Sequence, residues 1–217
     1  LSDKAEVPYS KTLIGDDEIR LARAQISEEA KERAREEVRA LYPDYEPGRH
    51  RLVLINPNAS DLLPQRRWMP EHFVEVMRRI LADYPDVLVL ITGSPAERDE
   101  AQGLKTRVDS DRCINFAGQV KFTDLLALYS IAATMLTNDS GPGHFSAVTD
   151  LPTFVIFGPE TPSLYGSLGN STPIYAGLAC SPCVSAANHR KTPCTDNVCV
   201  QVITPERVLE AMRPALG

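Results

Sequence analysis

The segment from Thr137 to His144 gathers residue types that can bind an anion beside a sugar. Gly141 permits close approach to the backbone, and Pro142 loses no hydrogen bond at the start of a helix. The free amides and the dipole of such a helix favour a diphosphate there. Asp139 can accept hydrogen bonds from sugar hydroxyls, and His144 can face the same phosphate. The alternative is a tight turn, with Asp139 as helix cap and His144 as an ordinary surface residue.

Two more loops carry polar residues, each just after an apolar stretch of the sequence. Residues able to offer backbone amides follow the first long apolar stretch: Asn58, Ala59 and Ser60. Arg66 or Arg67, a little further on, can neutralise a leaving phosphate. The alternative is that both arginines are solvated charges ahead of a helix. Glu97 follows the next apolar stretch. It could be a structural residue in the first turn of a helix, or it could bind a ribose.

Four of the five cysteines lie close together near the end of the chain. They are spaced as Cys180-x2-Cys183-x10-Cys194-x4-Cys199. Paired thiolates at short spacing suit zinc, so the pattern is compatible with a structural tetrahedral zinc site. Reduced or partly disulfide-linked thiols are the alternative, and a cytosolic location would favour reduced thiols. We expect no catalytic role for this segment, because it supplies no partner base.

The elements that position these loops alternate between short apolar runs and amphipathic helical stretches. This alternation is typical of βαβ units and a parallel sheet. We expect strands at 52–56, 87–92, 113–116, 134–138, 153–157 and, more weakly, 173–175. The runs are almost wholly apolar, which indicates an α/β, doubly wound, Rossmann-like sheet covered on both faces. Ligands of such sheets bind beyond the carboxyl ends of the strands, where the three loops lie.

Capping residues predict where the helices begin. Ser27 is expected to cap a polar helix, and Thr123 and Thr204 to cap two later ones. Pro70 and Pro205 suit the first turn of a helix, where a missing amide hydrogen bond costs nothing. We expect residues 1–50 to form a linker and this polar helix, and residues 51–217 to form the Rossmann-like domain, with the cysteines at 180–199 as an appendage.

Composition limits the kind of partner. The 217 residues are 43% hydrophobic and can bury one core. The net charge of -6 argues against general nucleic-acid binding, which needs a basic surface. The longest apolar run, Val87 to Ile91, is far shorter than the roughly 20 residues of a membrane span. The chain starts at Leu1 and shows no signal-like segment, so we expect it to be a piece of a longer protein.

From about Arg51 to the end, the chain resembles the C-terminal half of the ADP-heptose:lipopolysaccharide heptosyltransferases of glycosyltransferase family 9. Residues 138–144, Asn-Asp-Ser-Gly-Pro-Gly-His, are similar to the Asp-(Thr/Ser)-Gly-x-x-His donor motif of that family. Residues 157–162, Phe-Gly-Pro-Glu-Thr-Pro, resemble its Phe-Gly-Pro-Thr-x-Pro turn. The stretches at 55–59 and 68–70 are similar too. The resemblance implies the C-terminal half of an inverting GT-B enzyme.

The resemblance also implies roles for individual residues. Arg66 would contact the phosphates, Glu97 would bind the ribose, and Val120 would lie beside the adenine. The residues expected to hold the diphosphate and the sugar are Asp139, Ser140, Gly141 and His144. Two departures leave the donor sugar open. Arg66 stands where the family usually has Lys, and Glu160 with Thr161 replaces Thr followed by an acid.

We therefore predict the donor-binding domain of a glycosyltransferase that moves heptose or a related sugar from an ADP-sugar to a lipid-linked, lipopolysaccharide-type acceptor. Single displacement with electrostatic stabilisation of the leaving diphosphate requires no cofactor. The general base is expected on an N-terminal domain, so this chain alone is expected to be inactive. The alternatives are a nucleotide-binding regulatory or scaffold module without transfer activity, and an epimerase. The expected location is the cytoplasm, with a peripheral position at the inner membrane face as an option.

Overall fold

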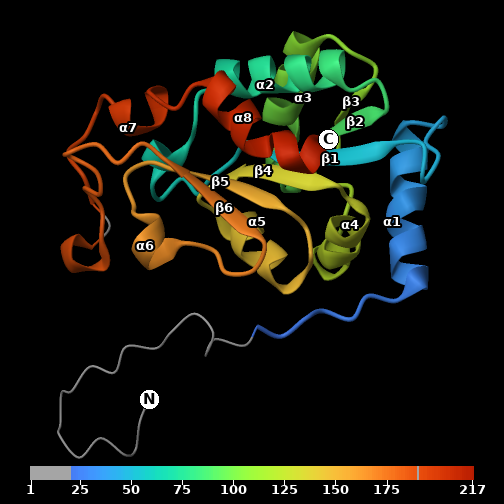
Figure 1. The fold of residues 1–217 in the computed structure, drawn as a ribbon, viewed down its shortest axis with the longest axis horizontal. Coiled ribbons are helices and arrows are strands. Elements are labelled where there is room, and N and C mark those ends of the chain that lie inside the picture. The colour runs from blue at the N-terminus through green and yellow to red at the C-terminus, as the bar shows by residue number, and fades with distance from the viewer. Residues whose placement is uncertain (1–20, 190) are drawn as a thin grey trace, which may run out of the picture.

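Six parallel strands form a single sheet in the computed structural model, which describes residues 21–189 and 191–217 (Figure 1). The strands lie in the order β3-β2-β1-β4-β5-β6. Their bounds are β1 Arg51–Asn56, β2 Val87–Ile91, β3 Cys113–Asn115, β4 Thr134–Asn138, β5 Thr153–Phe157 and β6 Ser171–Tyr175. The sequence prediction is confirmed for all six strands and for the α/β class. The largest difference is at β6, which begins two residues earlier than expected.

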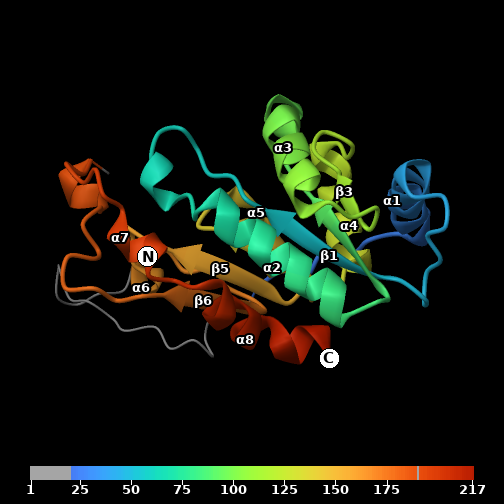
Figure 2. The same ribbon diagram turned by 90° about the horizontal axis from the view of Figure 1, so that it is seen from above.

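Helices cover both faces of the sheet (Figures 1 and 2). One face carries α2 (Pro70–Asp83), α3 (Arg98–Val108) and α8 (Pro205–Leu216), and α2 contacts both of the others. The other carries α1 (Glu28–Leu41), α4 (Leu125–Ile131) and α5 (Gly141–Phe145), and α1 packs against α4. The short helices α6 (Pro162–Tyr165), after β5, and α7 (Val198–Gln201), after β6, lie near the carboxyl ends of the strands (Figures 1 and 2).

The strands supply one core to each face. Val53 and Ile55 of β1 point into the core beneath α2, α3 and α8, whereas Leu52 and Leu54 point into the core beneath α1 and α4. β2 alternates in the same way. Because successive side chains of a strand point to opposite faces, a strand that is apolar throughout fits only a sheet buried on both sides. The apolar runs in the sequence therefore determine the three-layer arrangement.

The strand order changes direction between β1 and β4. The chain runs outward from β1 through β2 to β3, and then returns to add β4, β5 and β6 on the other side. The connections that leave β1 and β4 consequently turn toward opposite faces, which opens a crevice at the carboxyl ends of these two strands. The candidate site lies at this crevice.

Most of the predicted helix starts are confirmed. The Ser27 hydroxyl accepts a hydrogen bond from the Ala30 amide at 3.2 Å, and the Thr204 hydroxyl accepts one from the Arg207 amide at 3.4 Å. The predicted cap at Thr123 is wrong. A 3-10 turn, Phe122–Asp124, precedes α4, so the extended residue that starts this helical stretch is Lys121. Thr123 lies inside the turn and caps nothing.

The polar helix α1 is part of the folded unit. Its residues Ala34 and Val38 are buried, and the segment before it is attached to the 3-10 turn Ser146–Val148, between α5 and β5, by a hydrogen bond from the Ala24 amide to the Val148 carbonyl at 2.8 Å. Residues 1–20 lie outside the described residues, and the division at residue 51 stays a prediction. Within the described ranges, no helix combines the length and the apolar composition that crossing a membrane would require.

Candidate functional site

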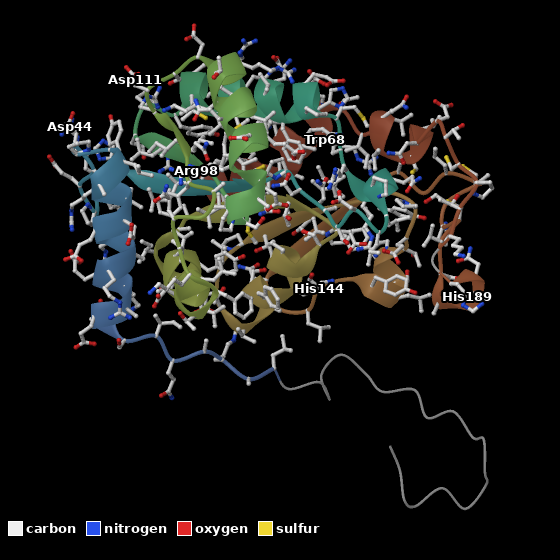
Figure 3. All side chains as sticks on the ribbon, turned by 180° about the vertical axis from the view of Figure 1, so that it is seen from behind. Asp44, Trp68, Arg98, Asp111, His144 and His189 are labelled. Carbon is white, nitrogen blue, oxygen red and sulfur yellow. The ribbon has the colours of Figure 1, made fainter. Side chains whose placement is uncertain are left out.

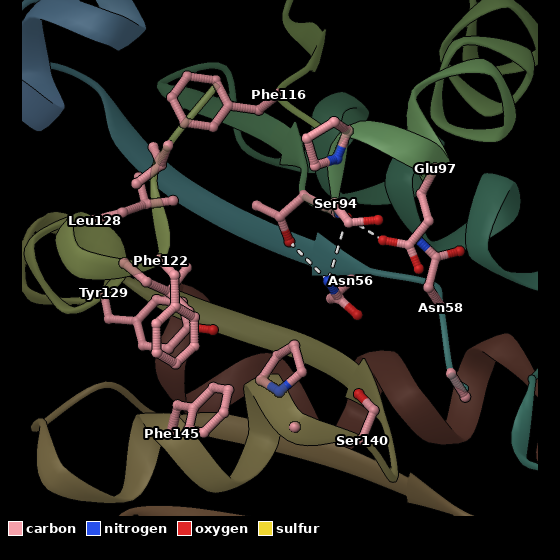
Figure 4. Close-up of a pocket in the computed structure, with 18 of the residues that line it drawn as sticks. Asn56, Asn58, Ser94, Glu97, Phe116, Phe122, Leu128, Tyr129, Ser140 and Phe145 are labelled. Carbon is pink, nitrogen blue, oxygen red and sulfur yellow. Dashed lines mark hydrogen bonds between the residues drawn. The ribbon is translucent and has the colours of Figure 1, made fainter. Parts of the chain in front are cut away.

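A cavity of about 400 Å³ opens at the crevice between the ends of β1, β2 and β4 (Figure 4). Its two sides differ in chemistry. Polar residues cover one side, and aromatic and aliphatic residues cover the other. The polar residues include Asn56, Asn58, Ser60, Thr92, Ser94, Glu97 and Ser140, and the apolar ones include Phe116, Val120, Phe122, Leu125, Leu128, Tyr129 and Phe145. A ligand with a flat apolar part and a polar part fits this division.

The polar side is built by the turns that follow β1 and β2. Asn56 donates from Nδ2 to the Thr92 carbonyl at 3.2 Å, which joins the two strand ends. Glu97 lies in the 3-10 turn Pro95–Glu97, and its carboxylate accepts a hydrogen bond from the Ser94 amide at 2.5 Å. The Nδ2 group of Asn58 is buried and makes no hydrogen bond within the described residues. An unpaired buried donor is costly, so a ligand oxygen beside Asn58 would be favoured.

The apolar side carries two aromatic rings in contact with solvent. Phe122, from the turn before α4, is 73% exposed, and Phe145, from α5, is 41% exposed. Their ring centroids are 5.2 Å apart, and the rings meet edge to face. Exposed aromatic surface within a cavity offers a planar ligand both stacking and edge contacts.

A group of charged side chains lies beside the cavity, and Arg66 is at its centre. Its Nη2 forms an ion pair with Oε2 of Glu160, and its Nε lies 3.6 Å from Oδ2 of Asp139. Its Nη1 donates to the Asp139 carbonyl at 3.4 Å. The side chains of Asp139 and Glu160 are 4% and 1% exposed. We call Arg66, Asp139, His144 and Glu160 the charged cluster.

His144 forms the outer edge of the charged cluster, where its side chain is half exposed (Figure 3). Its Nε2 lies 3.8 Å from Oδ1 of Asp139, and its Nδ1 is 3.2 Å from the Ser167 hydroxyl. Burial lowers the pKa of His144 below its ordinary value of 6.5, and the nearby Arg66 guanidinium lowers this pKa further, while Glu160 opposes the shift. The imidazole is therefore neutral at pH 7.

Asn138, the last residue of β4, joins this strand to the connection that follows β1. Its Oδ1 accepts a hydrogen bond from the Trp68 amide at 3.0 Å, and its Nδ2 donates to the Pro57 carbonyl at 2.7 Å. The Trp68 indole donates to the Ile203 carbonyl at 2.8 Å. The buried amide at the end of β4 thus bonds both ends of the connection between β1 and α2, which limits where Arg66, two residues before Trp68, can lie.

The structure divides the predicted site residues into two adjoining sets. One set lines the cavity: Asn58, Ala59, Ser60, Glu97, Val120, Ser140 and Gly141. Arg66, Asp139 and His144 lie in the charged cluster instead. Asp139 does not cap α5, because Ser140 occupies the cap position. Arg67 is bonded to the Ala59 carbonyl at 2.7 Å and to Asp61, which ties it to the loop.

Sequence reasoning missed several residues of the site. The apolar side chains of Phe122 and Phe145 gave no signal, because the sequence does not show that they face a cavity. Asn56 did carry a signal in the sequence, since it is a polar residue that ends an apolar run. Glu160 was noticed only as a departure from a family pattern, whereas the structure shows it in contact with Arg66.

The four clustered cysteines are free thiols, as is Cys113. Burial raises the pKa of Cys199 to about 11, and the charges of the neighbouring thiols add to this shift. In the part of the chain that the structure describes, no three His, Cys, Asp or Glu side chains are grouped in a way that could hold a metal ion. The thiols as arranged do not fit zinc, and the zinc site stays a prediction.

A family model described as glycosyltransferase family 9 (heptosyltransferase) matches residues 15–192. Lipooligosaccharide heptosyltransferase 2 of Campylobacter jejuni is 26% identical over 170 residues, which are 76% of this chain and 51% of that protein. Lipopolysaccharide heptosyltransferase 1 of Pseudomonas aeruginosa is 30% identical over 152 residues, or 65% of this chain and 41% of that protein. The chain thus spans about half the length of the curated relatives that it matches.

Solved structures share the fold. The E. coli ADP-heptose LPS heptosyltransferase II has a TM-score of 0.69 at 20% identity, and the similarity covers 89% of this chain and 53% of that one. E. coli heptosyltransferase WaaC with ADP has a TM-score of 0.57 at 16% identity, covering 81% and 47%. These identities show similarity of fold alone. The family model, however, matches most of the chain, and the chain therefore belongs to glycosyltransferase family 9, the heptosyltransferase family.

Proposed function

We propose that this chain binds the donor of a glycosyl transfer, a nucleoside diphosphate sugar linked to ADP. The observation that carries this proposal is a cavity with one aromatic side and one polar side, next to a partly buried arginine, Arg66. The adenine would lie against Phe122 and Phe145, and the ribose would lie beside Asn58 and Glu97. The diphosphate would extend past Ser140 and Gly141 toward Arg66.

The relatives support the choice of donor and acceptor. WaaC was solved with ADP, and other relatives are named as heptosyltransferases of lipopolysaccharide or lipooligosaccharide. We extend this to a heptose or a related sugar as the transferred group and to a lipid-linked saccharide as the acceptor. The chain spans only about half of its relatives, so these assignments concern the longer protein to which such a domain contributes.

In the proposed reaction the acceptor hydroxyl displaces the diphosphate in one step, with inversion at the sugar carbon. Negative charge builds up on the departing diphosphate, and the fixed positive charge of Arg66 stabilises it. His144 adds hydrogen bonding at the outer edge and can take up a proton as that charge develops. The acceptor site and the base that removes the hydroxyl proton are assigned to a second, N-terminal domain.

Calorimetric titration of the chain with ADP tests the donor site. Binding is expected to weaken in Asn58→Ala, which removes the unpaired donor, and in Phe122→Ala, which removes an aromatic side chain. Leu41→Ala is the matched control, because Leu41 is an exposed apolar residue on α1, which does not line the cavity. The donor assignment is wrong if the unaltered chain does not bind ADP, or if all three variants bind it equally well.

A further inference from the structure

We propose that Glu160 is a positioning residue that holds the guanidinium of Arg66 in place for the donor diphosphate. This inference rests on the proposed function. It gives a role to Glu160, which stands where the family turn has Thr. Three strand ends take part. Arg66 follows β1, Asp139 follows β4, and Glu160 follows β5.

The contacts of Arg66 fix its side chain from two directions. Nη2 is paired with Glu160, while Nε and Nη1 face the carboxylate and the carbonyl of Asp139. Arginine otherwise has large rotamer freedom, and ordering its side chain costs conformational entropy. Two nearly buried carboxylates that engage different nitrogens cover this cost before the ligand arrives. A donor diphosphate would then meet a cation that is already oriented.

Glu160 can act in this way only if its own backbone is fixed, and the cysteine segment supplies that support. The Pro159 carbonyl accepts hydrogen bonds from the amides of Cys183 and Val184, both at 3.0 Å. The Gly158 carbonyl accepts one from the Ser181 hydroxyl at 2.5 Å. The turn that carries Glu160 is therefore attached to residues 181–184 on its outer side. Such support of a charged pair is what preorganisation of a site requires.

Two other roles for Glu160 predict different behaviour. If Glu160 only balanced the charge of Arg66 in the folded protein, its loss would lower the stability of the chain. It would not weaken ADP binding more than adenosine binding. If it competed with the phosphates for Arg66, its neutralisation would tighten the binding of a diphosphate. A positioning role predicts the reverse, a loss of affinity confined to ligands that carry phosphates.

The variants are Glu160→Gln, which removes the charge at nearly constant shape, and Glu160→Asp, which keeps it on a shorter side chain. Glu206→Gln is the matched control, because it removes a carboxylate 2.8 Å from Arg79 in an exposed pair on the face of α2 and α8. Each variant of the 217-residue chain is first checked for thermal unfolding. It is then titrated with ADP and with adenosine, which has the base and ribose but no phosphate.

We expect Glu160→Gln to weaken ADP binding about tenfold or more, since a charge-assisted contact that orients Arg66 is lost. Adenosine binding should stay unchanged. Glu160→Asp should recover part of the loss, and Glu206→Gln should behave like the unaltered chain. Equal losses for ADP and adenosine, no loss at all, or tighter ADP binding would each overturn the positioning role.

A second measurement needs no ligand. In ¹⁵N NMR spectra of the free chain, the side-chain Nε–H signal of Arg66, assigned from its loss in Arg66→Lys, should be sharp and protected from exchange. It should broaden in Glu160→Gln and remain sharp in Glu206→Gln. An unchanged signal in Glu160→Gln overturns the inference. If the unaltered chain binds no ADP, the proposed function fails, and this spectrum still decides whether Glu160 fixes Arg66.

Discussion

Asp139 joins the two nitrogen-bearing side chains of the charged cluster, Arg66 and His144. Its carboxylate lies near both Arg66 and His144, and its carbonyl accepts from Arg66. With His144 neutral, the cluster has one positive and two negative side chains when both carboxylates are ionised. A bound diphosphate would add further negative charge at this place. The site therefore gains stability from an additional proton, and His144 is the group that can take it up near neutral pH.

The first prediction follows from the lowered pKa of His144. A diphosphate beside the imidazole favours its charged form, so binding should raise the pKa of His144 and be accompanied by proton uptake. ADP affinity is expected to increase as the pH falls from the pKa of His144 in the complex to its lowered pKa in the free chain, and to be constant above that range. Calorimetry in buffers of different ionisation enthalpy measures the uptake. His144→Gln should remove it, and an affinity that does not depend on pH in the unaltered chain would contradict the prediction.

The sequence predicted the residues that line the cavity better than the contacts between the charged side chains. The residue types at Asn58, Glu97 and Gly141 indicated a ligand loop, and the structure brings these residues to one cavity. The pairing of Arg66 with Glu160 could not be foreseen, because it depends on the strand order, which places β1 and β5 on either side of β4. Residue types predict local chemistry, whereas partners from distant loops are determined by the strand order.

Among the elements, the turn after β5 is tightly enclosed. A Cβ atom added at Gly158 would overlap Cγ1 of Val200, which is fully buried, and would lie 3.4 Å from Sγ of Cys199. The turn between β5 and α6 and the short helix α7 are thus fitted together without spare volume. Close packing of this kind makes an added methyl group costly.

The second prediction concerns this fit. Gly158→Ala should destabilise the chain by about 1–3 kcal/mol through overpacking. Gly103→Ala is the matched control. Nothing lies within 4 Å of an added Cβ there, and alanine is a better helix former inside α3, so it should stabilise by about 0.5–1 kcal/mol. Urea unfolding measures both.

Combining Gly158→Ala with Val200→Ala should cost less than the sum of the two single changes, because the added and the removed methyl groups share one space. Strict additivity would show that the two residues do not share it.

The third prediction concerns the cysteine segment. Burial raises the pKa of Cys113 to about 12 and that of Cys199 to about 11, so both should resist alkylation at pH 8. The exposed Cys180 should react first, as mass spectrometry of digested protein would show.

Metal analysis of the same preparation tests the zinc prediction. About one zinc per chain, with Cys180 protected until a chelator is added, would support it. Protein that contains no metal, and in which all five thiols titrate freely after unfolding, would reject it.

The predicted helices show where element-level reasoning succeeds. Pro70 and the apolar spacing after it predicted α2 correctly, because both signals lie within the helix itself. Thr123 misled, because a hydroxyl residue before an apolar stretch does not distinguish a cap from the inside of a 3-10 turn. Helix α7 gave no signal, since its four residues depend on packing over Gly158 rather than on their own periodicity.

At the scale of the molecule, the cavity that the described residues line could hold a donor, but the proposed reaction needs more than a donor. An in-line displacement requires the acceptor hydroxyl, its base and the donor carbon to be held together. Such positioning is worth roughly 7–11 kcal/mol of the barrier. The chain spans about half of its relatives, which supports our assignment of the acceptor side to another domain.

The fourth prediction is that this chain folds and binds ADP but does not transfer sugar. It should be assayed with an ADP-heptose donor and a lipopolysaccharide-core acceptor, in parallel with a longer protein that includes an N-terminal domain. Transfer by the longer protein alone is the expected result. Robust transfer by this chain would mean that one of its own acids, Asp139 or Glu160, acts as the base. Binding without transfer by either would favour a regulatory module.

The placement of α4 between α1 and the cavity has a mechanical consequence. One side of α4 packs against α1, and Leu125, Leu128 and Tyr129 on it line the cavity. Val38 of α1 shares a core with Leu128 and Tyr129. The segment that leads into α1 is therefore coupled through α4 to the apolar wall of the cavity. In mechanical terms, a displacement of α1 would reach this wall directly, whereas the residues of the charged cluster lie on other elements.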